Sequence, residues 1–115
     1  MADYLFLFRG GAARREASPE DMQANMRRWG AWFEELTKKG HYHGSGAPLE
    51  NTGRVVSDNK SGVTDGPFVE SKDLVGGYAL ITANSIDDAA TIARDCPIFE
   101  YDGFVEVRPI REMNL

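Results

Sequence analysis

Apolar residues follow two patterns along this chain, short continuous runs that are typical of strands and a helical spacing that is typical of amphipathic helices. The first apolar segment predicts a strand. Tyr4–Phe8 is apolar without a polar interruption, which is typical of a strand covered on both faces and therefore central in its sheet. Arg9-Gly10-Gly11 ends this strand and a polar stretch follows. The run is too short for a membrane span or for the core of a signal peptide, so we expect neither.

The next segment has the signals of an amphipathic helix. Ser18 suits the N-cap, Pro19 suits the first helical position, and Gly40 follows the lysines at the end. An apolar stripe recurs at helical spacing and consists of Met22, Met26, Trp29, Phe33 and Leu36, with Trp32 beside it. We expect the stripe to pack against a sheet rather than to form an aromatic ligand site.

Residues 41–83 predict shorter strands separated by turns. His41–His43 is a short strand and residues 44–48 are a loop. Arg54–Ser57 and Gly62–Thr64 flank a polar turn, which predicts a hairpin. Gly76–Ala83 is a further apolar strand.

The C-terminal third predicts a second helix and a last strand. Ser85 is its expected N-cap and Pro97 its expected end. The expected buried stripe has small side chains that allow close packing on a sheet: Ile86, Ala89, Ala90, Ala93 and Cys96. Phe104–Ile110 is the last strand, and Pro109 places it at a sheet edge or at a strand end.

This order of elements predicts one α+β domain over residues 1–115 with a ferredoxin-like βαββαβ plan. Both helices then cover one face of the sheet. We expect apolar side chains on the other face, from Phe6 or its neighbours, Tyr78, Leu80 and Val107. An apolar sheet face open to water is an aggregation hazard, so we predict a homodimer that buries this face.

Composition narrows the class of protein. Apolar residues make up 42% and charged residues 27% of the chain, which suits a packed core. The net charge of −5, with only short basic clusters, disfavours direct binding to nucleic acid. Cys96 is the only cysteine, which excludes an internal disulfide and a cysteine-rich zinc site and fits a reducing cytoplasm. We expect it to be a small buried side chain.

Asp65 is the first candidate for chemistry. It precedes Gly66-Pro67 in what reads as a sharp turn. In a functional role, its carboxylate would be a base or a hydrogen-bond acceptor in a pocket. In a structural role, Asp65 would be a turn residue whose side chain caps backbone amides, and the sequence does not decide between the two roles. Glu70 and Lys72 lie on the same side of the chain if this stretch is extended. There they could tune each other's ionisation in a site, or they could form a solvated ion pair that contributes little to stability.

The histidines and arginines are weaker candidates. His41 and His43 have alternate spacing, but no third ligand is signalled, so we expect no metal. His43 is the better candidate for a general acid or base paired with Asp65. Arg9 and Arg108 stand at strand ends, where each could receive an anionic ligand, although a surface or interface ion pair is the simpler interpretation.

Several segments resemble the YCII-related superfamily, and within it the branch named for its DGPF motif. The resemblance spans nearly the whole chain and rests on segments in the order expected for that family: Pro48–Glu50, Arg54–Val56, Asp65–Phe68, Glu70–Lys72, Gly76–Tyr78, Cys96–Ile98 and Val105–Ile110. It implies ferredoxin-like subunits in a dimeric α/β-barrel assembly, with a pocket at the sheet face near the DGPF turn. It also implies a bacterial protein.

The resemblance implies less about activity. Some relatives in the wider superfamily are dehydrochlorinases of chlorinated hydroxyquinones, with a proposed catalytic His–Asp pair. The histidine of that pair lies early in the chain, whereas residues 9–18 contain none here. Only the positions of the DGPF branch carry over, led by Asp65. Other members resemble partners of extracytoplasmic-function sigma factors, but this chain has no sigma-factor region.

Two functional hypotheses follow. The first is a dimeric small-molecule-binding protein or a cofactor-independent acid–base enzyme, lyase or dehydrochlorinase-like. Its site would use Asp65 and His43 for chemistry and, for binding, Glu70, Lys72, Tyr78 and Arg9. The second is a non-catalytic interaction module associated with regulation of a sigma factor. A pocket with Asp65 pointing inward favours the first, and a broad exposed apolar strip favours the second.

Overall fold

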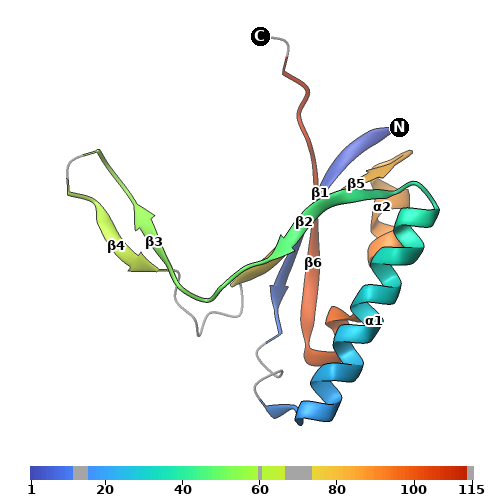
Figure 1. The fold of residues 1–115 in the computed structure, drawn as a ribbon. Coiled ribbons are helices and arrows are strands. Elements are labelled where there is room, and N and C mark those ends of the chain that lie inside the picture. Colours follow the sequence, from blue (N-terminus) through green and yellow to red (C-terminus); the bar gives the residue numbers. More distant parts are fainter. Residues whose placement is uncertain (12–15, 60, 67–73, 114–115) are drawn as a thin grey trace.

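An antiparallel sheet with both helices on one face forms the body of the protein (Figure 1). The computed structural model describes residues 1–11, 16–59, 61–66 and 74–113. The sheet has the strand order β2-β5-β1-β6, with β1 (Ala2–Gly10), β2 (Tyr42–Pro48), β5 (Val75–Ala83) and β6 (Gly103–Pro109). The helices are α1 (Pro19–Lys38) and α2 (Ile86–Ala93), and a 3-10 helix, η2 (Pro97–Tyr101), precedes β6. The predicted α+β class is confirmed.

A separate hairpin projects from this body (Figure 1). It consists of β3 (Gly53–Val56) and β4 (Val63–Gly66), and we call these two strands the arm. The hairpin was predicted, but Asp65 and Gly66 are strand residues paired with Arg54 and Gly53 rather than turn residues. The pairing across the arm holds these residues extended.

Both helices begin at the predicted caps. The Ser18 hydroxyl accepts a hydrogen bond from the Asp21 amide at 3.1 Å, and the Ser85 hydroxyl accepts one from the Asp88 amide at 3.1 Å. Each bond satisfies an amide that has no partner inside its helix. Gly40 follows α1 with a φ of +80°, a conformation that favours glycine.

Alternation along β1 decides which side chains form the core. Phe6 is fully buried, and Tyr4 and Phe8 are each 7% exposed, whereas Leu5 and Leu7 are only half-buried. β1 is central, as predicted, but one of its faces is covered far better than the other. The apolar run therefore indicated the position of the strand correctly and the burial of its second face incorrectly.

The open face of the sheet has a different composition from the predicted one. Phe6 pairs with Val107, and paired residues share a face, so both side chains point toward the helices. The expectation that Val107 supplies the open face was wrong, and of the two alternatives, Phe6 or its neighbours, the neighbours lie there. Leu5 and Leu7 lie on the open face with their partners Leu80 and Tyr78, as expected for the last two.

β2 is longer than predicted because it pairs with β5. Residues 44–48 were expected to be a loop, but Gly46, Ala47 and Pro48 lie opposite Ala79, Tyr78 and Gly77. A shift of register between Tyr42 and Gly46 accommodates the turn-forming residues between them. Backbone pairing at the sheet edge thus overrides local composition.

The second helix also differs in detail. Ala89, Ala93 and Cys96 are buried as predicted, but Ile86 is 46% exposed and Ala90 is exposed. α2 ends at Ala93, before Pro97, which instead begins η2. β6 lies at a sheet edge with Pro109 as its last residue, which confirms that prediction.

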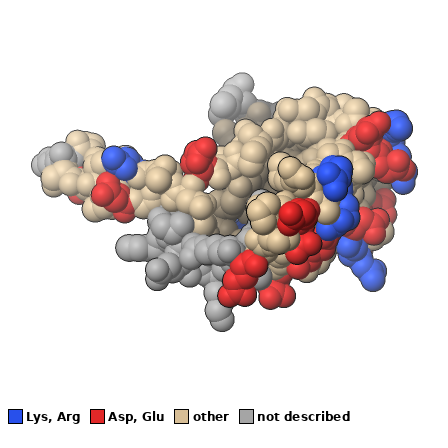
Figure 2. All heavy atoms as spheres, turned by 60° about the horizontal axis from the view of Figure 1, so that its bottom comes forward, with Lys and Arg blue, Asp and Glu red and all other residues tan. Residues whose placement is uncertain are grey.

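The surface carries charges of both signs. Figure 2 shows acidic and basic side chains interspersed over the end of the molecule opposite the arm. The visible face therefore does not form a basic surface of the kind that attracts nucleic acid. Within the described residues, none of the helices has the length and apolar character needed to cross a membrane.

Candidate functional site

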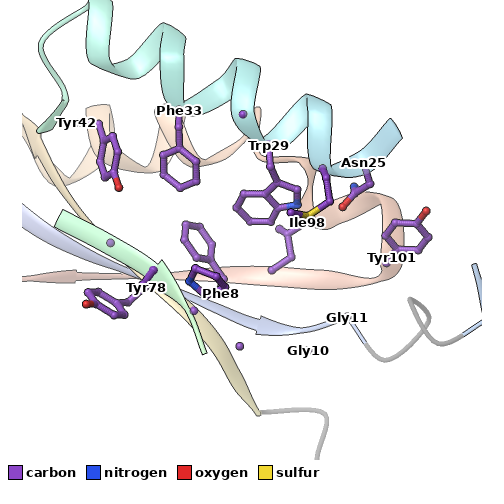
Figure 3. A pocket seen from close by; sticks show the side chains of 17 residues that line it. Phe8, Gly10, Gly11, Asn25, Trp29, Phe33, Tyr42, Tyr78, Ile98 and Tyr101 are labelled. Carbon is purple, nitrogen blue, oxygen red and sulfur yellow. The ribbon is translucent and has the colours of Figure 1, made fainter. Parts of the chain in front are cut away.

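A cavity of about 510 Å³ lies between α1 and the helix-facing side of the sheet (Figure 3). Its described lining comes from two helices and three strands: Phe8, Gly10, Gly11, Asn25, Met26, Trp29, Gly30, Phe33, Tyr42, Gly46, Ala47, Pro48, Gly76, Gly77, Tyr78, Ile98 and Tyr101. This volume falls in the range of about 300–1,000 Å³ that is usual for small-molecule sites.

One wall of the cavity is aromatic. Phe8 from β1 meets Trp29 of α1 edge to face, with ring centroids 4.9 Å apart, and Trp29 stacks on Phe33 at 5.9 Å. Phe33 in turn contacts Tyr42 of β2 at 4.7 Å. Such pairs add about 0.5–1.5 kcal/mol beyond area burial, so this wall holds its shape without a ligand.

The apolar stripe of α1 therefore has two roles rather than the one predicted. Trp32 and Leu36 are buried in the core at 8% and 5% exposure. Trp29 and Phe33 pack only partly against that core and line the cavity. Met26 is 59% exposed at the cavity margin. One side of the stripe, with Trp32 and Leu36, packs into the core. The other side, with Trp29 and Phe33, borders a space large enough for a ligand.

Glycines leave room for this space. Gly30 lies on α1 beside the aromatic wall, and a Cβ placed on it would meet no atom within 4 Å. On the sheet side, the backbones at Gly46 and Gly77 come close to the neighbouring strand, where a Cβ at Gly46 would lie 2.7 Å from the Tyr78 carbonyl oxygen. The cavity floor is thus largely backbone.

The η2 end of the cavity is polar. Asn25 is only 1% exposed, and its Nδ2 donates to the Pro97 carbonyl at 3.3 Å. It lies beside Ile98 and Tyr101 (Figure 3).

An ion pair fixes η2 against α1 at this end. Arg28 Nε donates to Glu100 Oε2 at 2.7 Å, and Arg28 Nη2 donates to Glu100 Oε1. This two-bond contact with Arg28 holds the pKa of the Glu100 carboxyl below its usual value, with a smaller contribution from Asn25. Glu100 therefore stays ionised and keeps accepting from Arg28.

The chemistry that this lining offers is mainly that of binding. None of its described side chains is a carboxylate, an imidazole, an ammonium or a guanidinium. The polar groups are the Asn25 amide, the indole N–H of Trp29 and the hydroxyls of Tyr42 and Tyr101, since the Tyr78 ring points to the open face of the sheet. An uncharged, largely apolar molecule fits such a lining, because an ion would lose its hydration without a compensating charge.

Asp65 lies on the arm rather than in this cavity. Its side chain is 90% exposed, and its Oδ1 is 3.2 Å from Arg54 Nη1 on the paired strand. Glu70 and Lys72, which were predicted to act beside it, lie outside the described residues. A chemical role for Asp65 stays a prediction, and the described cavity lining does not include it.

The other predicted site residues are dispersed. His43 is exposed on β2, and within the described part of the chain Asp65 pairs with Arg54 rather than with His43. Arg9 Nη1 lies 2.5 Å from Glu106 Oε1 on β6, and this contact lowers the pKa of Glu106. Of the predicted site residues that the structure describes, Tyr78 alone belongs to the cavity lining. Alternation along β5 turns its ring toward the open face, so its hydroxyl points away from the cavity.

Most residues of the cavity lining are not among the predicted site residues. The helical stripe predicts core packing for Trp29 and Phe33, and Asn25 is not among the predicted residues either. A signal was present, because Asn25 precedes Trp29, Trp32 and Leu36 at helical spacings of four, three and four. A polar residue within such a stripe is buried with its stripe and needs hydrogen-bond partners.

Comparison with known families agrees with the resemblance seen in the sequence. The family model described as the YCII-related domain matches residues 11–114, which is nearly the whole chain. No curated protein matches the chain.

Proposed function

This chain belongs to the YCII-related domain family, and we propose that it is a binding protein for a small, uncharged, largely apolar molecule. The ligand occupies the cavity between α1 and the sheet. The observation that carries this proposal is a space of about 510 Å³ with an aromatic wall and no charged side chain in its described lining. Pockets that are mostly apolar with a few polar groups are typical of small-molecule sites.

The test uses ligand-induced thermal stabilisation of the wild-type chain and of two matched variants. Gly30→Leu places a side chain in the open space beside Trp29 without a backbone clash. Ala31→Leu adds the same side chain at the next, exposed position of α1, outside the cavity lining. The compounds are naphthalene, decalin and octanol, which are uncharged and differ in shape.

We expect at least one compound to raise the melting temperature of the wild type and of Ala31→Leu but not of Gly30→Leu. A ligand present at 100 times its Kd stabilises the folded state by about 2.7 kcal/mol. Equal stabilisation of both variants would place the site elsewhere. No stabilisation of any of the three proteins would refute the proposed function.

We also propose that two copies associate through the open face of a ferredoxin-like subunit. The strand order β2-β5-β1-β6 supports this assignment of the fold. Leu5, Leu7 and Leu80 are half-buried on the open face, and Tyr78 is 38% exposed there. An apolar face of this kind favours contact with a second copy over exposure to water.

Acid–base chemistry by Asp65 and His43 is the second candidate function. The arm that carries Asp65 exposes Val55, Val56 and Val63 at 47%, 68% and 56%, which supports contact of the arm with another protein surface. Chemistry would require such a contact to bring Asp65 to a substrate. Asp65→Ala distinguishes the candidates, because binding in the α1 cavity persists in this variant whereas turnover by an arm site is lost.

The same exposed valines support a non-catalytic interaction module. In that case the arm binds a partner protein and the α1 cavity has no ligand. The compound panel separates this alternative from the proposed function, because only a ligand-binding protein distinguishes Gly30→Leu from Ala31→Leu.

A further inference from the structure

Asn25 is a buried polar group at one end of an otherwise apolar cavity. It is 1% exposed and belongs to the cavity lining. A buried side-chain amide normally satisfies both its N–H groups and its oxygen. A hydrogen-bond partner that the Asn25 amide lacks inside the protein therefore indicates which group a ligand in the cavity should supply.

The orientation of the Asn25 amide follows from its partners. The Pro97 carbonyl can only accept, and Asn25 Nδ2 donates to it at 3.3 Å. Asn25 also contributes to the lowered pKa of Glu100, as a donor group near a carboxylate does. The Nδ2 group is therefore the end that faces Pro97 and Glu100, and the amide oxygen faces elsewhere. Because Arg28 keeps Glu100 ionised, Glu100 remains an acceptor and the orientation is held.

The amide oxygen itself has no hydrogen-bond donor among the described residues. No side-chain polar atom of the described part is both enclosed and without a partner. The oxygen must therefore border open space, and the space that Asn25 borders is the cavity.

We infer that the ligand carries an uncharged hydrogen-bond donor, a hydroxyl or a ring N–H on a flat ring, which it directs at Asn25 Oδ1. This inference rests on the proposed function and adds the chemical class and the direction of binding. The aromatic wall of Phe8, Trp29 and Phe33 receives the ring (Figure 3). An ammonium donor is disfavoured, because the described lining has no carboxylate to balance its charge.

The test compares three probes of similar shape with the full chain at pH 7: 2-naphthol, 2-methoxynaphthalene and naphthalene. Only 2-naphthol has a donor, whereas the methyl ether retains an oxygen that can only accept. Binding is followed through tryptophan fluorescence, because Trp29 lines the cavity. We expect 2-naphthol to bind about three- to tenfold more tightly than the ether, the usual net effect of one hydrogen bond.

Asn25→Leu tests the role of the amide oxygen itself. It keeps a similar volume and removes the acceptor, so the preference for 2-naphthol should vanish while naphthalene binds at least as well. Gln23→Leu, at an exposed position of the same helix, is the matched control and should keep the preference. If Asn25→Leu does not fold, the ¹³C shift of the Asn25 side-chain carbonyl in the wild type decides, since only 2-naphthol should perturb it.

The outcomes separate the inference from the function on which it rests. Equal binding of 2-naphthol and its ether, or a preference that survives in Asn25→Leu, overturns the inference and leaves an apolar binding site. Absence of binding by all three probes and by the earlier compounds overturns both.

Discussion

Replacing Gly30 with alanine should stabilise this protein, and the structure gives the size of the effect. Gly30 lies inside α1, where glycine is less favourable than alanine by about 0.5–1 kcal/mol. A Cβ there meets no atom within 4 Å, so no steric cost offsets this gain. For a chain of this length, the expected rise in melting temperature is about 2–6 °C.

Gly40 provides a matched control. A Cβ at Gly40 also meets no atom within 4 Å, but its φ is +80°. Placing alanine in that conformation costs about 1–2 kcal/mol of folding free energy. Gly40→Ala should therefore destabilise the protein, whereas Gly30→Ala should stabilise it. Urea unfolding followed by circular dichroism measures both. A Gly30→Ala protein less stable than the wild type, or a Gly40→Ala protein as stable, would refute the reasoning.

The Gly30→Ala substitution should also weaken ligand binding. The added methyl group occupies part of the space beside Trp29, so Gly30→Ala should bind naphthalene more weakly than the wild type while unfolding at higher denaturant. Substitutions that stabilise a protein commonly cost function where they alter a binding site. If Gly30→Ala raised both the affinity for naphthalene and the denaturant concentration at which the chain unfolds, Gly30 would not be the residue that keeps the cavity open.

Three further predictions concern the ion pair, the thiol and the open face. Since Arg28 lowers the pKa of Glu100 from its usual 4.5, the pair stabilises the protein above that pH and loses its effect as pH falls through the lowered pKa. Glu100→Gln should therefore be less stable than the wild type at pH 7, and urea unfolding should show this difference vanishing as the pH falls through that lowered pKa. Burial raises the pKa of Cys96 to about 12, so its reaction with an aromatic disulfide at pH 8 should be slow until urea unfolds the chain, and fast labelling of the native protein would contradict this. Leu7→Lys should convert the proposed dimer to a monomer by light scattering, and a wild type that is already monomeric at high concentration would refute the dimer.

Local signals in the sequence predicted the elements well. Ser18 and Ser85 were identified as caps because a hydroxyl that accepts from an amide three residues later is a contact within a few residues. The arm was found for a similar reason, since two short strands around a polar turn need only each other. The edge position of β6 followed from Pro109, which lacks the donor that a central strand needs.

Contacts between distant residues were harder to predict. Residues 44–48 have the composition of a loop, yet they form β2 because β5 offers an edge with which to pair. Val107 was assigned to the wrong face, and the sequence did not distinguish Phe6 from its neighbours, because an apolar run has no internal marker of which side the helices cover. Asp65 lies on the arm and outside the described lining of the α1 cavity, so a pocket beside it stays a prediction.

The candidate site shows this limit most clearly. The stripe on α1 was visible in the sequence, but whether Trp29 or Trp32 faces the core depends on how the helix is rotated above the sheet. That rotation depends on packing against β1 and η2, through contacts such as Phe8 with Trp29 and Asn25 with Pro97. A space between two elements is a property of neither alone.

The sequence by itself determined the elements, their caps, the α+β class and the family, because these depend on nearby residues and on recurring motifs. Only the tertiary structure decided that α1 leaves a cavity beside its aromatic residues and that Asn25 lies at its polar end. The reason is physical, since a helix that carries Gly30 and faces the glycines of β5 cannot fill the gap between them, and the gap exists only once both are in place.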